Sequence, residues 1–203
     1  MTAYAQRERR LLADLFLRLG PDQPTLCAGW TTRDLAAHLV VRDRRPDAAA
    51  GAMIPALHAH GERVRLRTAA RPFEEIVRDV RTPPRWSPVS NPLLDELTNT
   101  IEFFVHHEDV RRGQPDWQPR DLDPGLEAAL WRSVRATGRL VLRRAGVPAT
   151  VVSEGYGSFT VGGISDATLS GPPGEVAIYL TGRKENARVS VVGDGLRQAR
   201  LGF

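Results

Sequence analysis

NPLLDELTNTIEFFVHHEDVRRG, residues 91–113, is the stretch that decides how the first part of this chain folds. Asn91-Pro92 is typical of a helix start, because an N-cap residue is followed by proline at the first helical position. Gly113, behind two arginines, is typical of a helix end. The apolar side chains occupy two faces, with Leu94, Leu97, Ile101, Phe104 and Val105 on one and Phe103 and Val110 nearly opposite. The pattern predicts a helix that is packed on both sides.

Other helices are predicted on either side of this one. They span residues 4–19, 32 to about 45, 73–81 and 124 to about 144. Thr31 and Asp34 form a variant of the capping box at the start of the second, and Asp123-Pro124 repeats the start signal before the last. Residues 47–71 mix helix and loop, and the proline-rich stretch 82–92 is predicted as loop.

The pattern changes after Pro148. Short segments rich in β-branched residues, separated by Gly or Asp, predict strands at residues 149–154, 158–161, 167–170 and 187–192. Residues 174–180 predict one short helix between them. Helices followed by strands indicate two regions. We therefore expect an all-helical domain over residues 1–147 and a small α+β domain over residues 148–203.

Glu102 and His106 are the residues of the 91–113 helix that could carry chemistry. They lie four positions apart, on a strip between the two apolar faces, so both side chains cover the same patch. A carboxylate and an imidazole in such a place need partners, and one divalent cation satisfies both. His38 lies on the core-facing stripe of the second helix, with Leu35 and Leu39, and could supply a third ligand. Two histidines, one carboxylate and a free fourth position are typical of a catalytic zinc site.

The same spacing has other readings. A single histidine on an apolar stripe is commonly a satisfied core residue, and Glu102 with His106 is commonly a hydrogen-bonded pair. The ion, if present, could be zinc, iron or nickel. Glu108 or Asp109 either orients an imidazole or forms a salt bridge. His58 and His60 are expected on the surface.

Composition narrows the class of protein. The chain has 203 residues, of which 41% are hydrophobic and 26% charged, so global disorder is excluded. No apolar run reaches the ~20 residues that a membrane helix needs, and charges near the N-terminus argue against a signal peptide. A single cysteine, Cys27, cannot form an internal disulfide. We expect a cytoplasmic protein with no membrane partner.

An excess of basic over acidic residues can indicate a protein that binds nucleic acid. The formal charge is +4, and Lys184 is the only lysine among 28 basic residues, the rest being arginine. The arginines are dispersed and few aromatics lie between them, which argues against nucleic acid as a partner. A DNA-binding regulator stays open as a third hypothesis.

Three segments of the chain resemble the mycothiol-dependent maleylpyruvate isomerase-like family of actinobacteria, part of the DinB-like metal-binding superfamily. Residues 29–39, GWTTRDLAAHL, are similar to the family's opening of its second helix. Residues 102–110, EFFVHHEDV, are similar to its metal-binding segment. Residues 171–183, GPPGEVAIYLTGR, followed by residues 189–194, are similar to its C-terminal module.

This resemblance implies a fold and a site. It implies a DinB-like four-helix bundle that binds a divalent metal, usually zinc, through His38, Glu102 and His106. It also implies a small C-terminal α+β domain resembling sterol carrier proteins, in which Arg183 matches an arginine that matters for activity in the isomerase. Arg183 either binds a carboxylate or is only a cation placed favourably against the dipole of the short helix before it.

The resemblance also implies an activity. We expect a mycothiol-dependent isomerase or thiol S-transferase that joins the thiol to a small electrophilic substrate, in a monomer or homodimer. The alternative is a non-catalytic metal-binding or ligand-binding protein.

Overall fold

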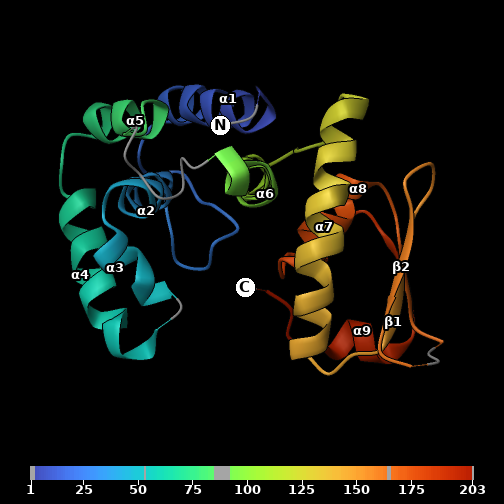
Figure 1. Ribbon diagram of the computed structural model, residues 1–203. Helices are drawn as coiled ribbons and strands as arrows, with labels where there is room; N and C mark the ends of the chain where they lie inside the picture. The colour runs from blue at the N-terminus through green and yellow to red at the C-terminus, as the bar shows by residue number, and fades with distance from the viewer. Residues whose placement is uncertain (1–2, 53, 85–91, 164–165, 203) are drawn as a thin grey trace. The chain divides into compact units, whose positions relative to one another are not determined.

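The chain folds into two compact units, residues Met1–Trp117 and Gln118–Phe203. The structure is a computed structural model that describes residues 3–52, 54–84, 92–163 and 166–202 (Figure 1). Residues 85–91 of the predicted proline-rich loop, Asn91 among them, lie outside the described residues, as do the side chains of Leu94 and Leu97.

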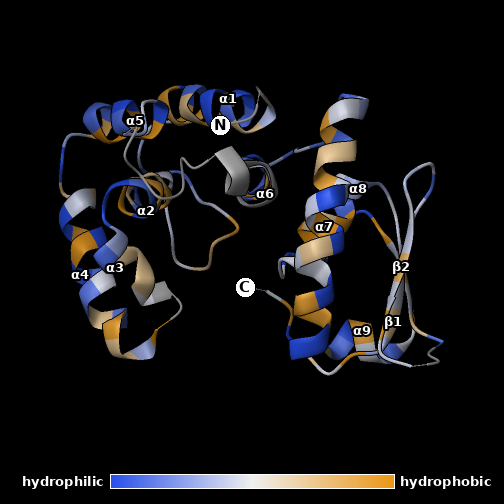
Figure 2. Cartoon of the chain, viewed as in Figure 1, coloured by the Kyte–Doolittle hydropathy of each residue, from blue (hydrophilic) through white to orange (hydrophobic). Residues whose placement is uncertain are grey.

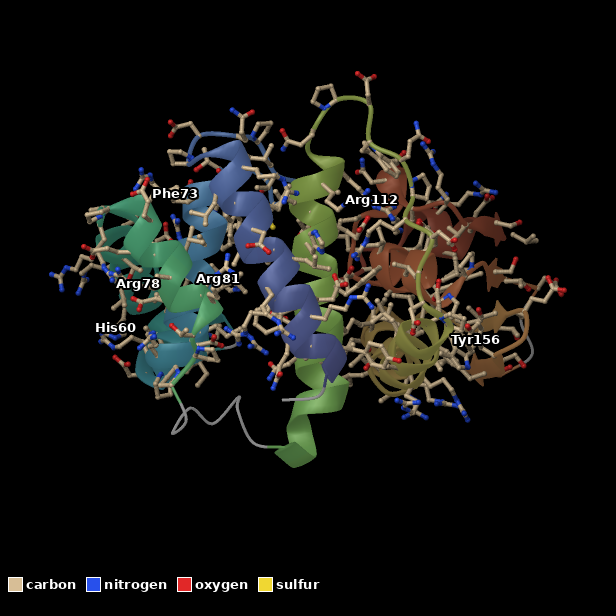
Figure 3. All side chains as sticks on the ribbon, turned by 90° about the horizontal axis from the view of Figure 1, so that it is seen from above. His60, Phe73, Arg78, Arg81, Arg112 and Tyr156 are labelled. Atoms are coloured by element: carbon tan, nitrogen blue, oxygen red, sulfur yellow. The ribbon has the colours of Figure 1, made fainter. Side chains whose placement is uncertain are left out.

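The first unit is helical. Its larger helices are α1 (Ala3–Leu19), α2 (Thr32–Arg44), α4 (His58–Ala69), α5 (Phe73–Arg81) and α6 (Pro92–Arg112). A short helix α3 (Pro46–Ala49) and two 3₁₀ turns, η1 (Ala50–Ala52) and η2 (Pro55–Leu57), connect α2 to α4. Helix α1 lies along α6, as Figure 3 shows from above. Figure 2 shows α1 and α5 striped with hydrophobic and hydrophilic residues, which is typical of amphipathic helices.

The core of this unit is shared by α1, α2, α5 and α6. Phe16 and Phe73 meet edge to face, with ring centroids 6.3 Å apart (Phe73 is labelled in Figure 3). Phe103 and Val110 of α6 belong to the same buried cluster, together with Leu12, Leu15, Leu35, Leu39, Ile76 and Val80. Ile101, Phe104 and Val105, on the other face of α6, are also buried. The prediction of two apolar faces on α6 is thereby confirmed for its described side chains.

Helix α2 begins where the capping box was predicted. The carboxylate of Asp34 accepts hydrogen bonds from the backbone N–H of Thr31, at 3.1 Å, and from its hydroxyl, at 2.9 Å. This anchors the first turn of the helix that carries His38.

The second unit holds a four-stranded sheet in the order β2-β1-β3-β4. Strand β1 (Ala149–Ser153) pairs antiparallel with β2 (Gly157–Val161) and parallel with β3 (Thr168–Ser170), which pairs antiparallel with β4 (Ser190–Val192). Helices α7 (Pro124–Arg144) and α8 (Pro173–Leu180) lie on one face of the sheet (Figure 1). A 3₁₀ turn η4 (Lys184–Asn186) and helix α9 (Asp194–Gln198) complete the unit.

The predicted helices are confirmed over their described residues. The first three predicted strands are confirmed to within a residue or two at their ends, and the fourth is confirmed only over Ser190–Val192 of the predicted residues 187–192. The predicted domain boundary differs from the observed division. The sequence placed the helix ending at residue 144 in the first domain, whereas α7 packs on α8 and β2. Trp131 of α7 lies 5.8 Å from Phe159 of β2, ring centroid to ring centroid. The amphipathic pattern of α7 indicated a buried face but not the unit against which that face packs. The first unit ends at Trp117 rather than at the predicted residue 147.

Among the described residues, no helix has the length and apolar character needed to cross a membrane.

Candidate metal centre

His38 of α2 and Glu102 and His106 of α6 come together in the first unit. The Nε2 atom of His38 lies 3.7 Å from Oε1 of Glu102, and Nε2 of His106 lies 3.4 Å from the same oxygen. The two imidazole rings are 5.4 Å apart and tilted by 71°. One ligand atom from each residue falls within 4.8 Å of the other two. The structure therefore brings together the three residues that the sequence singled out.

The local reasons for this convergence lie in two helices. Glu102 and His106 are one turn apart on α6, so their side chains point the same way. His38 is flanked on α2 by Leu35 and Leu39, which are fully buried and hold its face of the helix against α6 and the core. The side chains of His38 and Glu102 are each 27% exposed and that of His106 is 11% exposed. A small molecule can thus reach the cluster from one side.

Asp109 holds the other nitrogen of His106. Its Oδ2 lies 2.9 Å from Nδ1 of His106, and its side chain is fully buried. A carboxylate on Nδ1 favours the tautomer that keeps the proton there, which leaves the Nε2 lone pair for a ligand. The sequence left Glu108 and Asp109 open for this role. Glu108 instead accepts hydrogen bonds from Arg111 and Arg112, so Asp109 is the residue that orients the imidazole.

Cys27 contacts the same carboxylate. Its Sγ lies 3.2 Å from Oδ2 of Asp109. Cys27, His106 and Asp109 form a second group whose potential ligand atoms lie within 4.8 Å of one another.

Arg42 is a part of the site that the sequence analysis missed. Its Nε lies 3.2 Å from Oε1 of Glu102, and its Nη2 donates to Oδ1 of Asn99 at 2.6 Å. On its other side it lies 3.4 Å from the buried carboxylate of Asp43, which also pairs with Arg9. The signal was available, because Arg42 follows His38 by four residues and so covers the same face of α2.

These contacts set the charges of the three residues. Burial favours the neutral acid of Glu102, but Arg42 and the two imidazoles outweigh it and hold the pKa of Glu102 well below its ordinary value. Burial disfavours the imidazolium of His106, but Asp109, Cys27 and Glu102 raise its pKa well above its ordinary value. Burial lowers the pKa of His38.

The donor set suits a divalent ion. Two imidazole nitrogens and one ionised carboxylate are ligands that zinc, iron and nickel accept. The hydrogen bond from Asp109 to Nδ1 of His106 is the outer contact that histidine ligands of metals commonly make. Arg42 on the ligand oxygen of Glu102 opposes a cation electrostatically, but it also keeps that carboxylate ionised. The residues therefore fit a single divalent ion held by His38, Glu102 and His106.

A cavity of about 540 Å³ opens beside this cluster. His38, Arg42 and Glu102 line it at one end. Its other walls come from Trp30 in the loop before α2, from α2 itself, from the α3–η1 segment and from α4, and are largely apolar. They comprise Trp30, Val41, Pro46, Ala48, Ala49, Ala50, Gly51, His58, Gly61, Glu62 and Arg65.

Two histidines outside the cluster, His58 and His60, were predicted on the surface. His58 is exposed, as predicted, and it also lines the cavity. His60 is only partly buried and pairs with Asp47 at 2.9 Å, so its side chain has a surface partner.

Arg183 belongs to the second unit. It follows α8, and its Nη1 donates to the carbonyl of Thr181 at 2.5 Å. Its role in activity stays a prediction.

Comparison of the chain with models of known protein families, with curated proteins and with solved structures found no match.

Proposed function

We propose that this chain is a divalent-metal-dependent enzyme, zinc being the favoured ion, of the mycothiol-dependent isomerase or thiol S-transferase type. One observation carries the proposal. His38, Glu102 and His106 converge on a common point at the edge of a cavity of about 540 Å³, which is within the range of small-molecule sites. Three protein ligands leave a coordination position free, as in catalytic rather than structural zinc sites.

A divalent ion in this place would supply Lewis acidity, which favours the thiolate form of a thiol near neutral pH. The chain's own residues supply the rest. Asp109 keeps His106 oriented, and Arg42 keeps Glu102 ionised. The apolar wall of Val41, Pro46 and Ala49 excludes water from the apolar part of a small electrophilic substrate.

The resemblance described above adds the finer assignments to this proposal. In it the helices of the first unit form a DinB-like four-helix bundle, and the α+β unit is similar to sterol carrier proteins. Mycothiol is the thiol, and Arg183 binds a carboxylate of the thiol or of the substrate, because a guanidinium can engage both carboxylate oxygens.

Metal analysis tests the centre. We expect about one zinc per chain in the purified protein and none in His106→Ala. His60→Ala is the matched control, because His60 lies outside the cluster and pairs with Asp47. Undiminished zinc in His106→Ala would end the assignment.

One contact favours a second candidate, a ligand-binding protein without catalysis. Arg42 pairs with Glu102, so the carboxylate has a cationic partner without any metal. Turnover of mycothiol with a panel of small electrophiles, such as maleylpyruvate and alkyl halides, separates the candidates. An S-transferase consumes free thiol, whereas an isomerase releases the thiol again and converts maleylpyruvate to its trans isomer; either change is expected only when the enzyme is loaded with metal. The binding protein leaves both the thiol and the electrophile unchanged.

A further inference from the structure

One loop contacts both histidines of the cluster from outside. We call residues 24–30, between α1 and α2, the buttress loop. At one end of it the ring of Trp30 lies 5.2 Å from the ring of His38. In its middle, Sγ of Cys27 lies 3.2 Å from Oδ2 of Asp109, the same oxygen that holds Nδ1 of His106 at 2.9 Å.

The buttress loop is braced within itself. The hydroxyl of Thr25 donates to the carbonyl of Trp30 at 2.9 Å and accepts from the backbone N–H of Cys27 at 3.2 Å. The backbone N–H of Trp30 donates to the carbonyl of Cys27 at 2.9 Å. Cys27 and Trp30 are therefore held at a set separation, which lets the loop contact His38 through Trp30 and Asp109, the partner of His106, through Cys27.

The loop is also docked onto the C-terminal end of α6. Leu26 donates its backbone N–H to the carbonyl of Asp109 at 3.0 Å, and the side chain of Gln114 donates to the carbonyl of Pro24 at 2.9 Å. The docking depends on Gly113. A Cβ there would lie 2.7 Å from the carbonyl oxygen of Pro24 and 2.9 Å from Cα of Thr25, both backbone atoms that cannot rotate away.

Trp30 has a second partner that settles its orientation. The guanidinium of Arg65 lies 4.9 Å from the centroid of the Trp30 ring. Arg65 is itself held by Asp34, at 2.6 Å, and by Glu62, at 2.6 Å. The indole is thus held between a fixed cation and the imidazole of His38.

We infer that Cys27 and Trp30 are positioning residues, which set the orientation of His106 and His38 for the divalent ion. The inference rests on the proposed function, since it concerns the same centre. Cys27 acts through Asp109: its thiol and His106 share one carboxylate oxygen, so the thiol restricts where that oxygen can lie. Trp30 acts by packing, which restricts the rotation of the His38 ring. Groups that orient metal ligands in this way commonly change metal affinity by about 10–100-fold when removed.

Co²⁺ is the probe for this role, because its visible absorption spectrum reports the geometry of the ligands around it. Co²⁺ is titrated into the metal-free full chain against a competing chelator, and the spectrum is recorded at saturation. We expect Cys27→Ala to bind Co²⁺ about tenfold more weakly and with an altered visible spectrum. Cys27→Ser keeps a hydrogen-bond donor and is expected to restore most of the affinity and the spectrum. The same contrast is expected between Trp30→Leu and Trp30→Phe, because phenylalanine keeps an aromatic face against His38.

Gly113→Ala tests the docking without altering any residue that contacts a ligand of the metal. It is expected to weaken Co²⁺ binding several-fold and to shift the spectrum in the same sense as Cys27→Ala. Gly195→Ala is the matched control, since a Cβ there would meet its nearest atom at an ordinary 3.8 Å. The thermal unfolding temperature of each metal-free variant is measured as well. It shows whether a change in Co²⁺ affinity comes with a loss of fold stability.

Each alternative result has a distinct meaning. Wild-type protein that binds no Co²⁺ removes the proposed centre and the positioning role with it. Normal binding with unchanged affinity and spectrum in Cys27→Ala, Trp30→Leu and Gly113→Ala overturns the positioning role and leaves the centre standing. An intense near-ultraviolet thiolate band in the wild-type Co²⁺ spectrum would make Cys27 a direct ligand, which also overturns the role.

Discussion

Nε of Arg42 lies 3.2 Å from Oε1 of Glu102, the carboxylate oxygen that the imidazoles of both His38 and His106 also face. A guanidinium and a divalent ion therefore compete for one oxygen. Two unit charges 4 Å apart interact by about 4 kcal/mol at an effective dielectric constant of 20, and a divalent ion carries twice that charge. The repulsion between Arg42 and the ion is therefore larger than the ~1–3 kcal/mol of metal-binding free energy that is lost when a contact orienting a ligand, such as that of Arg42 with Glu102, is removed.

Arg42→Gln is expected to bind zinc at least about tenfold more tightly than the wild type, because the repulsion is the larger effect. Competition against a zinc chelator measures it. Arg45→Gln is the control, since Arg45 is exposed and pairs with Asp47. Weaker zinc binding in Arg42→Gln would mean that holding Glu102 in place outweighs the repulsion.

Asp109→Ala is expected to lower zinc affinity by about 10–100-fold, because His106 loses the partner on Nδ1. Isothermal titration of the metal-free protein with zinc provides the measurement. Glu154→Gln is the control. It also changes a carboxylate, but Glu154 lies in the exposed turn between β1 and β2, in the second unit. Equal affinities in Asp109→Ala and the wild type would show that Asp109 is a structural partner only.

Much of this site was predictable because helix periodicity is local. The i, i+4 spacing of Glu102 and His106 and the position of His38 among Leu35 and Leu39 follow from one repeat, and Pro and Gly mark the helix ends. The choice of Asp109 over Glu108 was not predictable in the same way. It depends on Arg111 and Arg112 taking Glu108 and on Cys27 arriving from 82 residues away.

The cavity could not be predicted from the sequence, for a different reason. Its wall is built where α3 and η1 approach α4 closely enough that a Cβ on Gly61 would lie 2.7 Å from the carbonyl oxygen of Ala48. Such an approach depends on tertiary packing, and residues 47–71 gave no single periodic pattern. The placement of α7 with the sheet is a tertiary choice of the same kind.

Asp43→Ala is expected to lower the free energy of unfolding by about 3–5 kcal/mol, because it leaves the buried guanidinium of Arg9 without its carboxylate. Arg9 would keep its hydrogen bond to the carbonyl of Val80 and its place over the ring of Phe103. Urea unfolding followed by circular dichroism measures the loss. The double variant Arg9→Met/Asp43→Leu removes both charges and is expected to recover most of it. No recovery in the double variant would mean that the pair is needed for packing rather than for charge balance.

Stability at acidic pH is expected to depend on Asp34. Burial favours its neutral acid, but hydrogen bonds from Arg65 and Thr31 outweigh it and lower the pKa of Asp34 below its ordinary value. A lowered pKa in the folded state contributes stability that is present above the unfolded value of about 3.9 and is lost as pH falls through the folded value. We therefore expect Asp34→Asn to be less stable than the wild type at pH 6, and the difference to shrink below about pH 4. A difference that stays constant down to pH 2 would contradict the ionic origin of the effect.

Ala49→Phe is expected to abolish turnover while leaving one zinc per chain. Ala49 is half-buried and lines the cavity, but it is not part of the metal cluster, so a phenyl ring there fills substrate space without touching a ligand. A phenyl ring at this position meets a largely apolar wall. The free energy of unfolding is therefore expected to fall by no more than about 1–3 kcal/mol from overpacking. Loss of a small electrophile in the presence of thiol, by conjugation or by isomerisation, measures turnover, and metal analysis is run on the same sample. Ala70→Phe, at an exposed position that does not line the cavity, is expected to keep full turnover. Retained turnover in Ala49→Phe would show that the substrate does not bind in this cavity. The substrate would then have to reach the metal centre by another route.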